Sequence, residues 1–186
     1  MKKLSEILDN IIDFSVHPDH IDWTLDQVKD VEKKIGACFS EDYIFYLQHY
    51  GCDYLKEGYM FSSKNNLPKE IIDFDIGGIF GLYDKAENLI KYTESYKTIL
   101  PAELFPIAFS GGGDLICMAK RDGRVFYWKH DATYINESTF YLADSFSDFI
   151  FGFKKCEMME AVSTNVEVTL RPEFEMALKK AAEKYK

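Results

Sequence analysis

Residues 105–130, FPIAFSGGGDLICMAKRDGRVFYWKH, decide the fold of this 186-residue chain. Apolar runs follow one another in this stretch, separated first by a glycine-rich turn and then by Asp122-Gly123. An Asp-Gly pair between two such runs is typical of a two-residue type I′ β-hairpin. The resulting register places Cys117 opposite Trp128, so this apolar face of the hairpin is expected to belong to the core.

The residues before this stretch predict helices. Apolar side chains at helical spacing over residues 4–12 indicate an amphipathic helix. Thr24 and Gln27 have the spacing of a capping box for a second helix, which Gly36 ends. Ser40 can cap a third helix.

Short runs rich in aromatic and β-branched residues begin near residue 54 and predict strands. The clearest run alternates Ile72, Phe74 and Ile76 with Asp73 and Asp75. This alternation predicts a single strand that carries both aspartates on its exposed side.

Two more helical segments complete the domain, one over residues 86–96 and one that Ser145 caps and that ends near Lys154-Lys155. We therefore expect an α+β domain over residues 1–158, with a central, mainly antiparallel sheet flanked by helices. Residues 159–186 predict a C-terminal strand–helix extension, whose apolar faces need to be covered.

The charge balance disfavours a nucleic-acid partner. The chain has 31 acidic and 22 basic side chains and a formal net charge of -9, which opposes binding of a phosphate backbone. Residues 1–94 hold 18 of the acidic and 10 of the basic side chains. Such an uneven field favours solubility or the attraction of a basic protein partner.

The composition also bears on the compartment. No apolar run is long enough to span a bilayer, and no signal peptide is visible. The cysteines are scattered without paired spacing, which indicates reduced thiols and a cytoplasmic protein. They are Cys38, Cys52, Cys117 and Cys156.

Three segments resemble the SUKH superfamily, an α+β family of bacterial immunity proteins that also contains a fungal regulator of cell-wall synthesis. The first segment, residues 24–51, carries Val28, Glu32, Gly36, Asp42, Tyr43, Leu47 and Gly51. The second is the pair of strands with FPIAF and GGDLIC, which continues into VFYWKH. The third is SFSDFI at residues 145–150. The sequence departs from the family at Cys38-Phe39-Ser40, where Leu-Pro is usual.

The resemblance implies an intracellular immunity protein that binds a cognate polymorphic toxin and blocks it by stoichiometric occlusion. If the toxin is a nuclease, its active face must be basic, and an acidic binder suits it. The alternative is a regulatory protein-interaction scaffold without a toxin, as the fungal relatives suggest. No complete catalytic constellation appears, so we expect no enzymatic activity.

The best acidic patch lies around the strand with the two aspartates. Because lysines are not interleaved with these carboxylates as they are on the second helix, a partner-binding role gains weight here, beside the alternative of a solvated surface. Two tyrosines beside it can supply aromatic anchors. The predicted patch consists of Asp73, Asp75, Glu70, Asp53, Glu57, Tyr54 and Tyr59.

The other candidate sites in the sequence have weaker support. The loop at 110–114 has no Lys-Ser/Thr and no helix after it, so a flexible turn is favoured over a phosphate site. Cys117 lies diagonally across the predicted hairpin from His130, yet a buried core thiol is the favoured interpretation. The segments 17–22 and 49–52 hold His, Asp and Cys without a complete ligand set. No metal and no cofactor is therefore predicted.

Overall fold

The computed structural model describes residues 1–16, 22–51, 53–62, 67, 71, 73–83, 88–132 and 138–156. The predicted strand–helix extension over residues 159–186 lies outside the described residues. Among the residues that are described, none of the helices is both long and apolar enough to cross a membrane.

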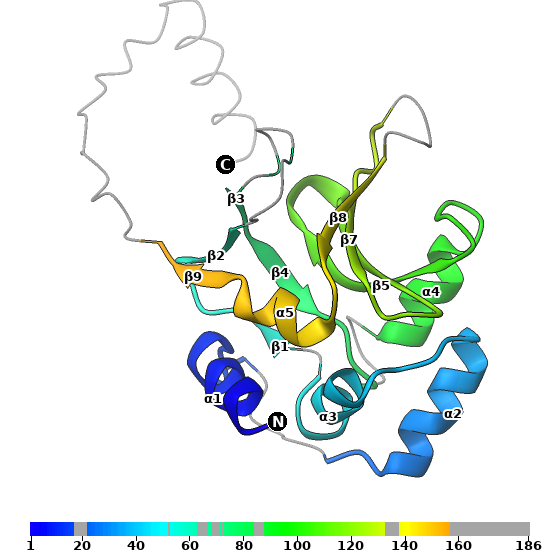
Figure 1. The fold of residues 1–186 in the computed structure, drawn as a ribbon, viewed down its shortest axis with the longest axis horizontal. Helices are drawn as coiled ribbons and strands as arrows, with labels where there is room; N and C mark the ends of the chain where they lie inside the picture. The colour runs from blue at the N-terminus through cyan, green and yellow to red at the C-terminus, as the bar shows by residue number, and fades with distance from the viewer. Residues whose placement is uncertain are drawn as a thin grey trace, which may run out of the picture. The chain divides into compact units, whose positions relative to one another are not determined.

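A six-stranded sheet forms the centre of the fold, and every neighbouring pair of strands in it runs antiparallel. Its order is β1-β4-β5-β6-β7-β8 (Figure 1). The predicted α+β class with a central antiparallel sheet is confirmed. The strands are β1 (Asp53–Tyr54), β4 (Ile76–Ile79), β5 (Leu104–Ser110), β6 (Leu115–Ala119), β7 (Val125–Trp128) and β8 (Thr139–Ala143).

A second, three-stranded sheet places β2 (Tyr59–Ser62) between β3 (Asp73–Phe74) and β9 (Phe153–Lys155). The predicted single strand through Phe74 and Ile76 is therefore wrong, because β3 and β4 belong to different sheets. The chain changes sheet at Asp75, whose carbonyl accepts a hydrogen bond of 2.9 Å from the Ser110 hydroxyl.

Five helices accompany the sheets in the described part of the chain. Figure 1 shows α1, α2 and α3 gathered at one end of the sheets, whereas α4 lies beside β5. The helices are α1 (Lys2–Ile11), α2 (Leu25–Ile35), α3 (Glu41–His49), α4 (Leu89–Tyr96) and α5 (Phe146–Phe151). The last helix does not reach Lys154-Lys155 as predicted, because the chain re-enters the small sheet as β9.

The predicted helix signals are confirmed at α2 and α5. The Thr24 hydroxyl accepts a hydrogen bond from the Gln27 amide at 3.3 Å, and Gln27 Oε1 accepts one from the Thr24 amide at 2.9 Å. Gly36 ends α2 in the left-handed region with φ 70°. Ser145 Oγ accepts from the Asp148 amide at 3.0 Å. At α3, by contrast, Ser40 makes no side-chain cap bond.

The strands β6 and β7 form the predicted hairpin, but the predicted register is wrong. Cys117 lies opposite Phe126 rather than Trp128. The loop has four residues, 120–123, instead of two. It is closed by a hydrogen bond of 2.8 Å from the Ala119 amide to the Arg124 carbonyl. Gly123 supplies the left-handed residue, with φ 72°, which such a longer hairpin loop uses.

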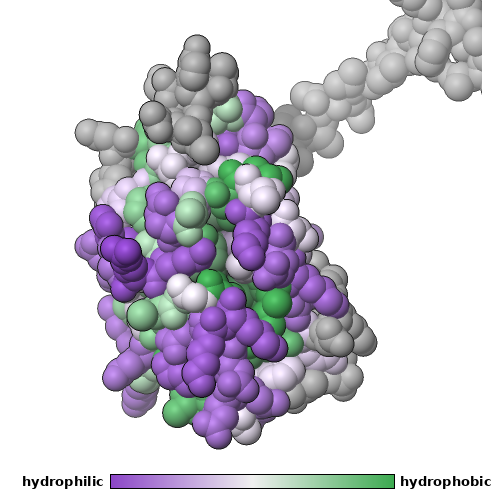
Figure 2. All heavy atoms as spheres, turned by 90° about the vertical axis from the view of Figure 1, so that its right-hand side faces the viewer, coloured by the Kyte–Doolittle hydropathy of each residue, from purple (hydrophilic) through white to green (hydrophobic). Residues whose placement is uncertain are grey.

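The hydrophobic core lies on both faces of the large sheet, which explains why all five residues of β6 are buried. On one face, Tyr43 of α3 packs against Phe146 of α5, with ring centroids 5.1 Å apart. On the other face, Tyr92 of α4 stacks on Phe80 at 4.0 Å. Figure 2, which views the molecule from the right-hand side of Figure 1, shows a mainly hydrophilic surface with hydrophobic groups between the polar ones.

Two glycines in β4 let an aromatic ring lie directly on the backbone. A Cβ atom on Gly77 would stand 1.9 Å from Cε2 of Phe109, and one on Gly78 would stand 3.1 Å from Cε1 of the same ring. Only glycine permits such an approach between a strand and a ring on its neighbour. Phe109 is thereby held between β4 and Tyr54, whose ring lies edge-on at 6.3 Å.

Candidate functional site

The structure divides the predicted acidic patch, and Asp53 is the clearest correction. Its carboxylate is buried, with 7% of the residue exposed, and accepts a hydrogen bond from the Tyr46 hydroxyl at 3.0 Å and another from the Gly51 amide. Tyr46 also donates to the carbonyl of Ile79 at 3.3 Å. Asp53 therefore anchors β1 to α3 and β4, and does not belong to an exposed surface.

The two aspartates of the predicted strand go to different places. Asp73 stands in β3 opposite Ser62 of β2, in the small sheet. Asp75 is exposed between the sheets, and its Oδ1 lies 4.0 Å from the position that a Cβ on Gly111 would take. Glu70 lies outside the described residues.

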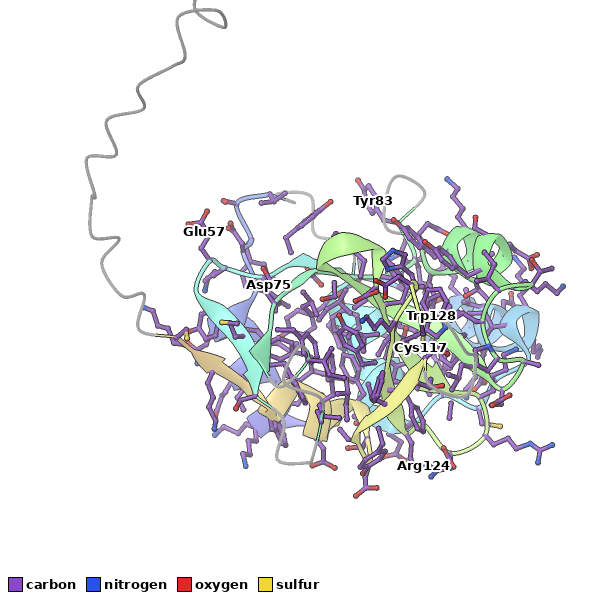
Figure 3. The ribbon with its side chains drawn as sticks, turned by 90° about the horizontal axis from the view of Figure 1, so that it is seen from above. Glu57, Asp75, Tyr83, Cys117, Arg124 and Trp128 are labelled. Atoms are coloured by element: carbon purple, nitrogen blue, oxygen red, sulfur yellow. The ribbon has the colours of Figure 1, made fainter. Side chains whose placement is uncertain are left out.

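The remaining members of the patch are partly accessible. Glu57 is exposed in the turn before β2, and Tyr59 is half-buried opposite Lys155 of β9. Tyr54 is half-buried against Phe109. Figure 3 places Glu57 and Asp75 toward the same side of the molecule, away from Arg124. Among the described residues, neither carboxylate forms an ion pair with a basic side chain.

Next to Asp75, the glycine turn leads into a carboxylate that sequence reasoning treated only as a turn residue. Asp114 Oδ2 accepts a hydrogen bond of 2.6 Å from the Tyr127 hydroxyl, and Oδ1 accepts one of 2.9 Å from the His130 amide. The His130 ring nitrogen Nδ1 lies 2.7 Å from the same Oδ1. Only the pairing of β6 with β7 brings these groups together, so no local motif could have revealed them.

The environment of Asp114 keeps it ionised. Partial burial would by itself raise the pKa of this carboxyl, but the hydrogen bonds from Tyr127 and His130 hold it below its ordinary value. Burial and the bond to Asp114 raise the pKa of the Tyr127 hydroxyl. We call Asp75, Gly111–Gly113, Asp114, His130 and Asp131 the glycine-loop rim.

The rim contains the one convergence of metal-capable groups found among the described residues. Ligand atoms of Asp114, His130 and Asp131 all lie within 4.8 Å of one another. Both oxygens of Asp114 already accept protein hydrogen bonds, and Lys129 Nζ lies 3.4 Å from Asp131 Oδ1. Protein groups thus satisfy this cluster, and we assign it no metal.

The two other segments with metal-capable side chains, 17–22 and 49–52, lie only in part within the described residues. His49 Nδ1 lies 3.2 Å from Asp22 Oδ1 in an exposed pair. His17, His20 and Cys52 lie outside the described residues. The described members therefore bring no ligand set together.

Cys117 does not form a nucleophile pair with His130. The thiol is fully buried, and burial raises the pKa of the Cys117 thiol well above its ordinary value. His130 is exposed and is engaged with Asp114. A reactive cysteine needs a stabilised thiolate and access to solvent, and Cys117 has neither.

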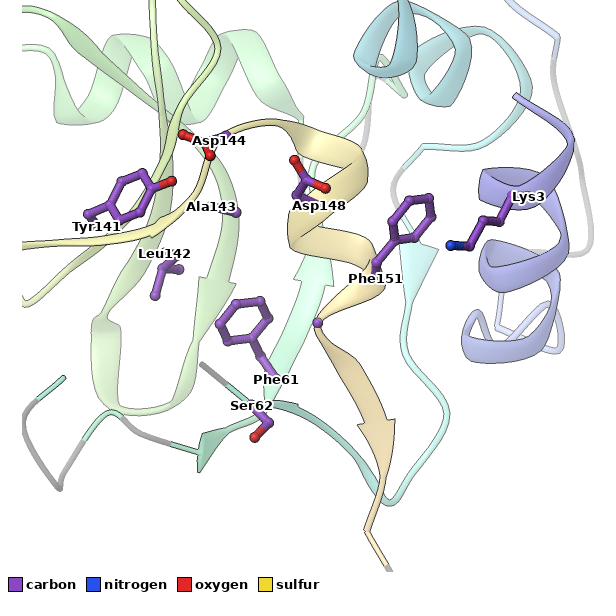
Figure 4. Close-up of a pocket in the computed structure, with 10 residues that line it drawn as sticks. Lys3, Phe61, Ser62, Tyr141, Leu142, Ala143, Asp144, Asp148 and Phe151 are labelled. Atoms are coloured by element: carbon purple, nitrogen blue, oxygen red, sulfur yellow. The ribbon is translucent and has the colours of Figure 1, made fainter. Parts of the chain in front are cut away.

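A pocket of about 460 Å³ opens on another part of the surface, between β8, α5, β2 and the start of α1. Figure 4 shows Asp144 beside Tyr141 toward one end, Asp148 between Asp144 and Phe151, Phe61 and Ser62 below them, and Lys3 beyond Phe151 at the other end. No local sequence signal predicted this pocket, because its walls come from segments far apart along the chain. Its lining residues are Lys3, Phe61, Ser62, Tyr141, Leu142, Ala143, Asp144, Asp148, Phe151 and Gly152.

Comparison with known proteins agrees with the fold. The sequence model of the SMI1 / KNR4 family (SUKH-1) matches residues 23–152. The SPbeta prophage-derived uncharacterized protein YokK of Bacillus subtilis (strain 168) is 28% identical over 148 residues, which cover 69% of this chain and 73% of that protein. The matched span includes the three segments on which the resemblance rests. The chain therefore belongs to the SMI1 / KNR4 family (SUKH-1).

Proposed function

We propose that this protein is an immunity protein of the cytoplasm, which binds a cognate polymorphic toxin and blocks it by covering its active face. Binding is stoichiometric and the protein performs no catalysis of its own. The resemblance to the SUKH superfamily, together with the family membership, supports this proposal. A basic toxin, such as a nuclease, is the partner that best complements a chain of net charge -9.

The observation that carries the proposal is a pair of exposed carboxylates, Asp75 of the glycine-loop rim and Glu57 before β2. Asp75 lies beside Gly111, and Glu57 is exposed toward the same side (Figure 3). Neither is neutralised by an ion pair within the described residues. Such carboxylates attract a basic protein over long range and act mainly on the rate of association.

Affinity capture from the native cell, followed by mass spectrometry, would identify the partner. With that partner, stopped-flow association rates would be measured across a series of salt concentrations. We expect association to be fast at low salt and to slow as salt rises. Glu57→Lys combined with Asp75→Lys should lower the low-salt association rate by about tenfold, and the difference should shrink at high salt.

The matched control is Asp26→Lys combined with Asp30→Lys, which changes the net charge by the same amount. Both aspartates are exposed on α2, where Lys29 and Lys33 lie one turn away. This variant should slow association less than the patch variant. Equal rates for both variants and the wild type would remove this surface as the docking face.

Capture also separates the alternative function. A toxin among the captured proteins, encoded by a gene beside that of this protein, would support the immunity role. Capture of cellular regulators alone would support the regulatory scaffold instead.

A further inference from the structure

The pocket beside β8 has a strong polarity along its length. At one end stand two exposed carboxylates, Asp144 directly after β8 and Asp148 in the first turn of α5. At the other end, Lys3 of α1 holds its ammonium 4.7 Å from the centroid of the Phe151 ring. Figure 4 shows this order, from Tyr141 and Asp144 across Asp148 and Phe151 to Lys3.

Neighbouring groups fix the two carboxylates in place. The Ser145 hydroxyl donates to Asp148 Oδ2 at 2.8 Å. The hydrogen bond from Tyr141 to Asp144 raises the pKa of the Tyr141 hydroxyl, so this phenol remains a donor. A carboxylate has about four lone-pair sites, so each retains acceptor capacity toward the pocket. Within the part of the chain that the structure describes, no basic side chain forms an ion pair with either carboxylate, so the acidic end is held in position without a paired cation.

The wall between the two ends is aromatic and aliphatic. Phe61 and Leu142 line it, and only 2% and 5% of these residues are exposed. Phe151 lines it as well and is only partly buried. A hydrocarbon stem gains by lying on such a wall, and a planar cation gains further from an aromatic face.

These features select the chemistry of the occupant. A cation at the acidic end meets two carboxylates, whereas an anion there would be repelled. The carboxylates come from different elements, and a guanidinium can bond to both through its fork of donors, which an ammonium matches less well. A pocket of about 460 Å³ has room for a long side chain together with part of the backbone that carries it.

We propose that this pocket receives an arginine side chain of a protein partner, with the guanidinium between Asp144 and Asp148 and the stem over Phe61 and Leu142. Lys3 orients the occupant, because it repels a cation from the far end. The kind of partner rests on the proposed function, whereas the pocket's preference for a guanidinium does not. The arginine is an anchor that holds the partner after long-range attraction has brought it in.

The test uses the full chain and a small probe, N-acetyl-L-argininamide, followed by amide chemical shifts in a two-dimensional NMR titration. We expect saturable shifts at Ser62, Leu142, Ala143 and Gly152. N-acetyl-L-lysinamide should bind more weakly, and the neutral N-acetyl-L-norleucinamide weaker still. Asp144→Asn with Asp148→Asn should weaken argininamide binding by about tenfold.

Matched variants make the result decisive. Asp26→Asn with Asp30→Asn changes the net charge equally on α2 and should leave binding unchanged. Lys3→Gln should leave it unchanged or tighten it. If the paired pocket variant does not fold, the single variants Asp144→Asn and Asp148→Asn carry the same comparison. Shifts that do not saturate, that lie elsewhere, or that are equal for argininamide and norleucinamide would overturn the proposal.

The argininamide titration and the capture experiment can succeed or fail independently of each other. Binding of argininamide with no toxin among the captured proteins would support the pocket and count against the immunity role. Capture of a toxin by a chain that does not bind argininamide would overturn the pocket alone.

Discussion

At the scale of the residue, Asp42 joins the starts of two helices. Its Oδ1 accepts hydrogen bonds from the Tyr43 amide at 2.9 Å and from the Ser40 hydroxyl, and its Oδ2 accepts one of 2.6 Å from the Ser147 amide at the start of α5. Burial would by itself raise the pKa of Asp42, but these hydrogen bonds hold it below its ordinary value of 3.8. One carboxylate thus fixes α3 against α5.

Replacing Asp42 by asparagine should lower the free energy of unfolding at pH 7 by about 1.5–3 kcal/mol, because an amide cannot accept all of these bonds. A carboxylate with a lowered pKa contributes stability that is fully present above pH 3.8 and is lost as the pH falls through the lowered value. The difference between wild type and Asp42→Asn should therefore shrink below pH 3.8. Urea unfolding from pH 7 to about pH 2 would measure it.

The neighbouring Glu41→Gln is the control for this prediction. Glu41 is exposed in the first turn of α3, so its replacement should change stability by no more than about 0.5 kcal/mol. A difference between wild type and Asp42→Asn that stays constant down to pH 2 would contradict the ionised role of Asp42.

At the scale of the element, β4 depends on the contact between its glycines and Phe109. Gly77→Ala should destabilise the protein by about 1–3 kcal/mol, because the new methyl group would stand 1.9 Å from a ring atom. In a Phe109→Ala background the same change should cost much less, since the ring is gone. Thermal and urea unfolding of the four members of this double-mutant cycle would measure the coupling.

Gly111→Ala serves as the control for the glycine prediction. The nearest atom to its new methyl group would be Asp75 Oδ1 at 4.0 Å, an ordinary contact. A cost for Gly77→Ala that is the same with and without the Phe109 ring would refute the steric explanation.

Elements also show what the sequence could and could not predict. Caps at Thr24 and Ser145 are local and were correct. The hairpin register was wrong, because a shift of two residues keeps each side chain on the same face, so the pattern of apolar residues fits both registers. The pattern through Phe74 and Ile76 could not show the change of sheet either. Both residues are buried, as a single strand would have them, but they belong to different sheets.

Sites were less predictable than elements, because pairing between distant strands creates them. In the sequence, Asp53 is one acidic residue among many. It is buried only because β1 pairs with β4 beside Tyr46. The carboxylates Asp144 and Asp148 line a pocket only because folding places Lys3 and Phe61, from the first third of the chain, beside them. The composition shows that the chain is acidic, and it gives no information on these placements.

At the scale of the whole molecule, Met1–Cys156 forms a compact unit with its own core. A chain ending at residue 160 should therefore still unfold cooperatively. Its unfolding midpoint or its association state should differ from that of the full chain, because the predicted apolar faces of the extension need cover. Differential scanning calorimetry and light scattering of both chains would measure this, and identical results would show that the extension is dispensable.

The small sheet has a consequence for how the protein is made. Its central strand, β2, is synthesised long before its partner β9, which pairs with it at Tyr59, Met60 and Phe61. Because a growing chain emerges from its N-terminus, one edge of β2 stays open throughout most of translation. Phe61 cannot be sealed against Phe149 and Phe153 until almost the whole domain has emerged. An interrupted chain that stops before Gly152 therefore displays an unfinished sheet edge and an exposed aromatic cluster, the features that chaperones and proteases recognise.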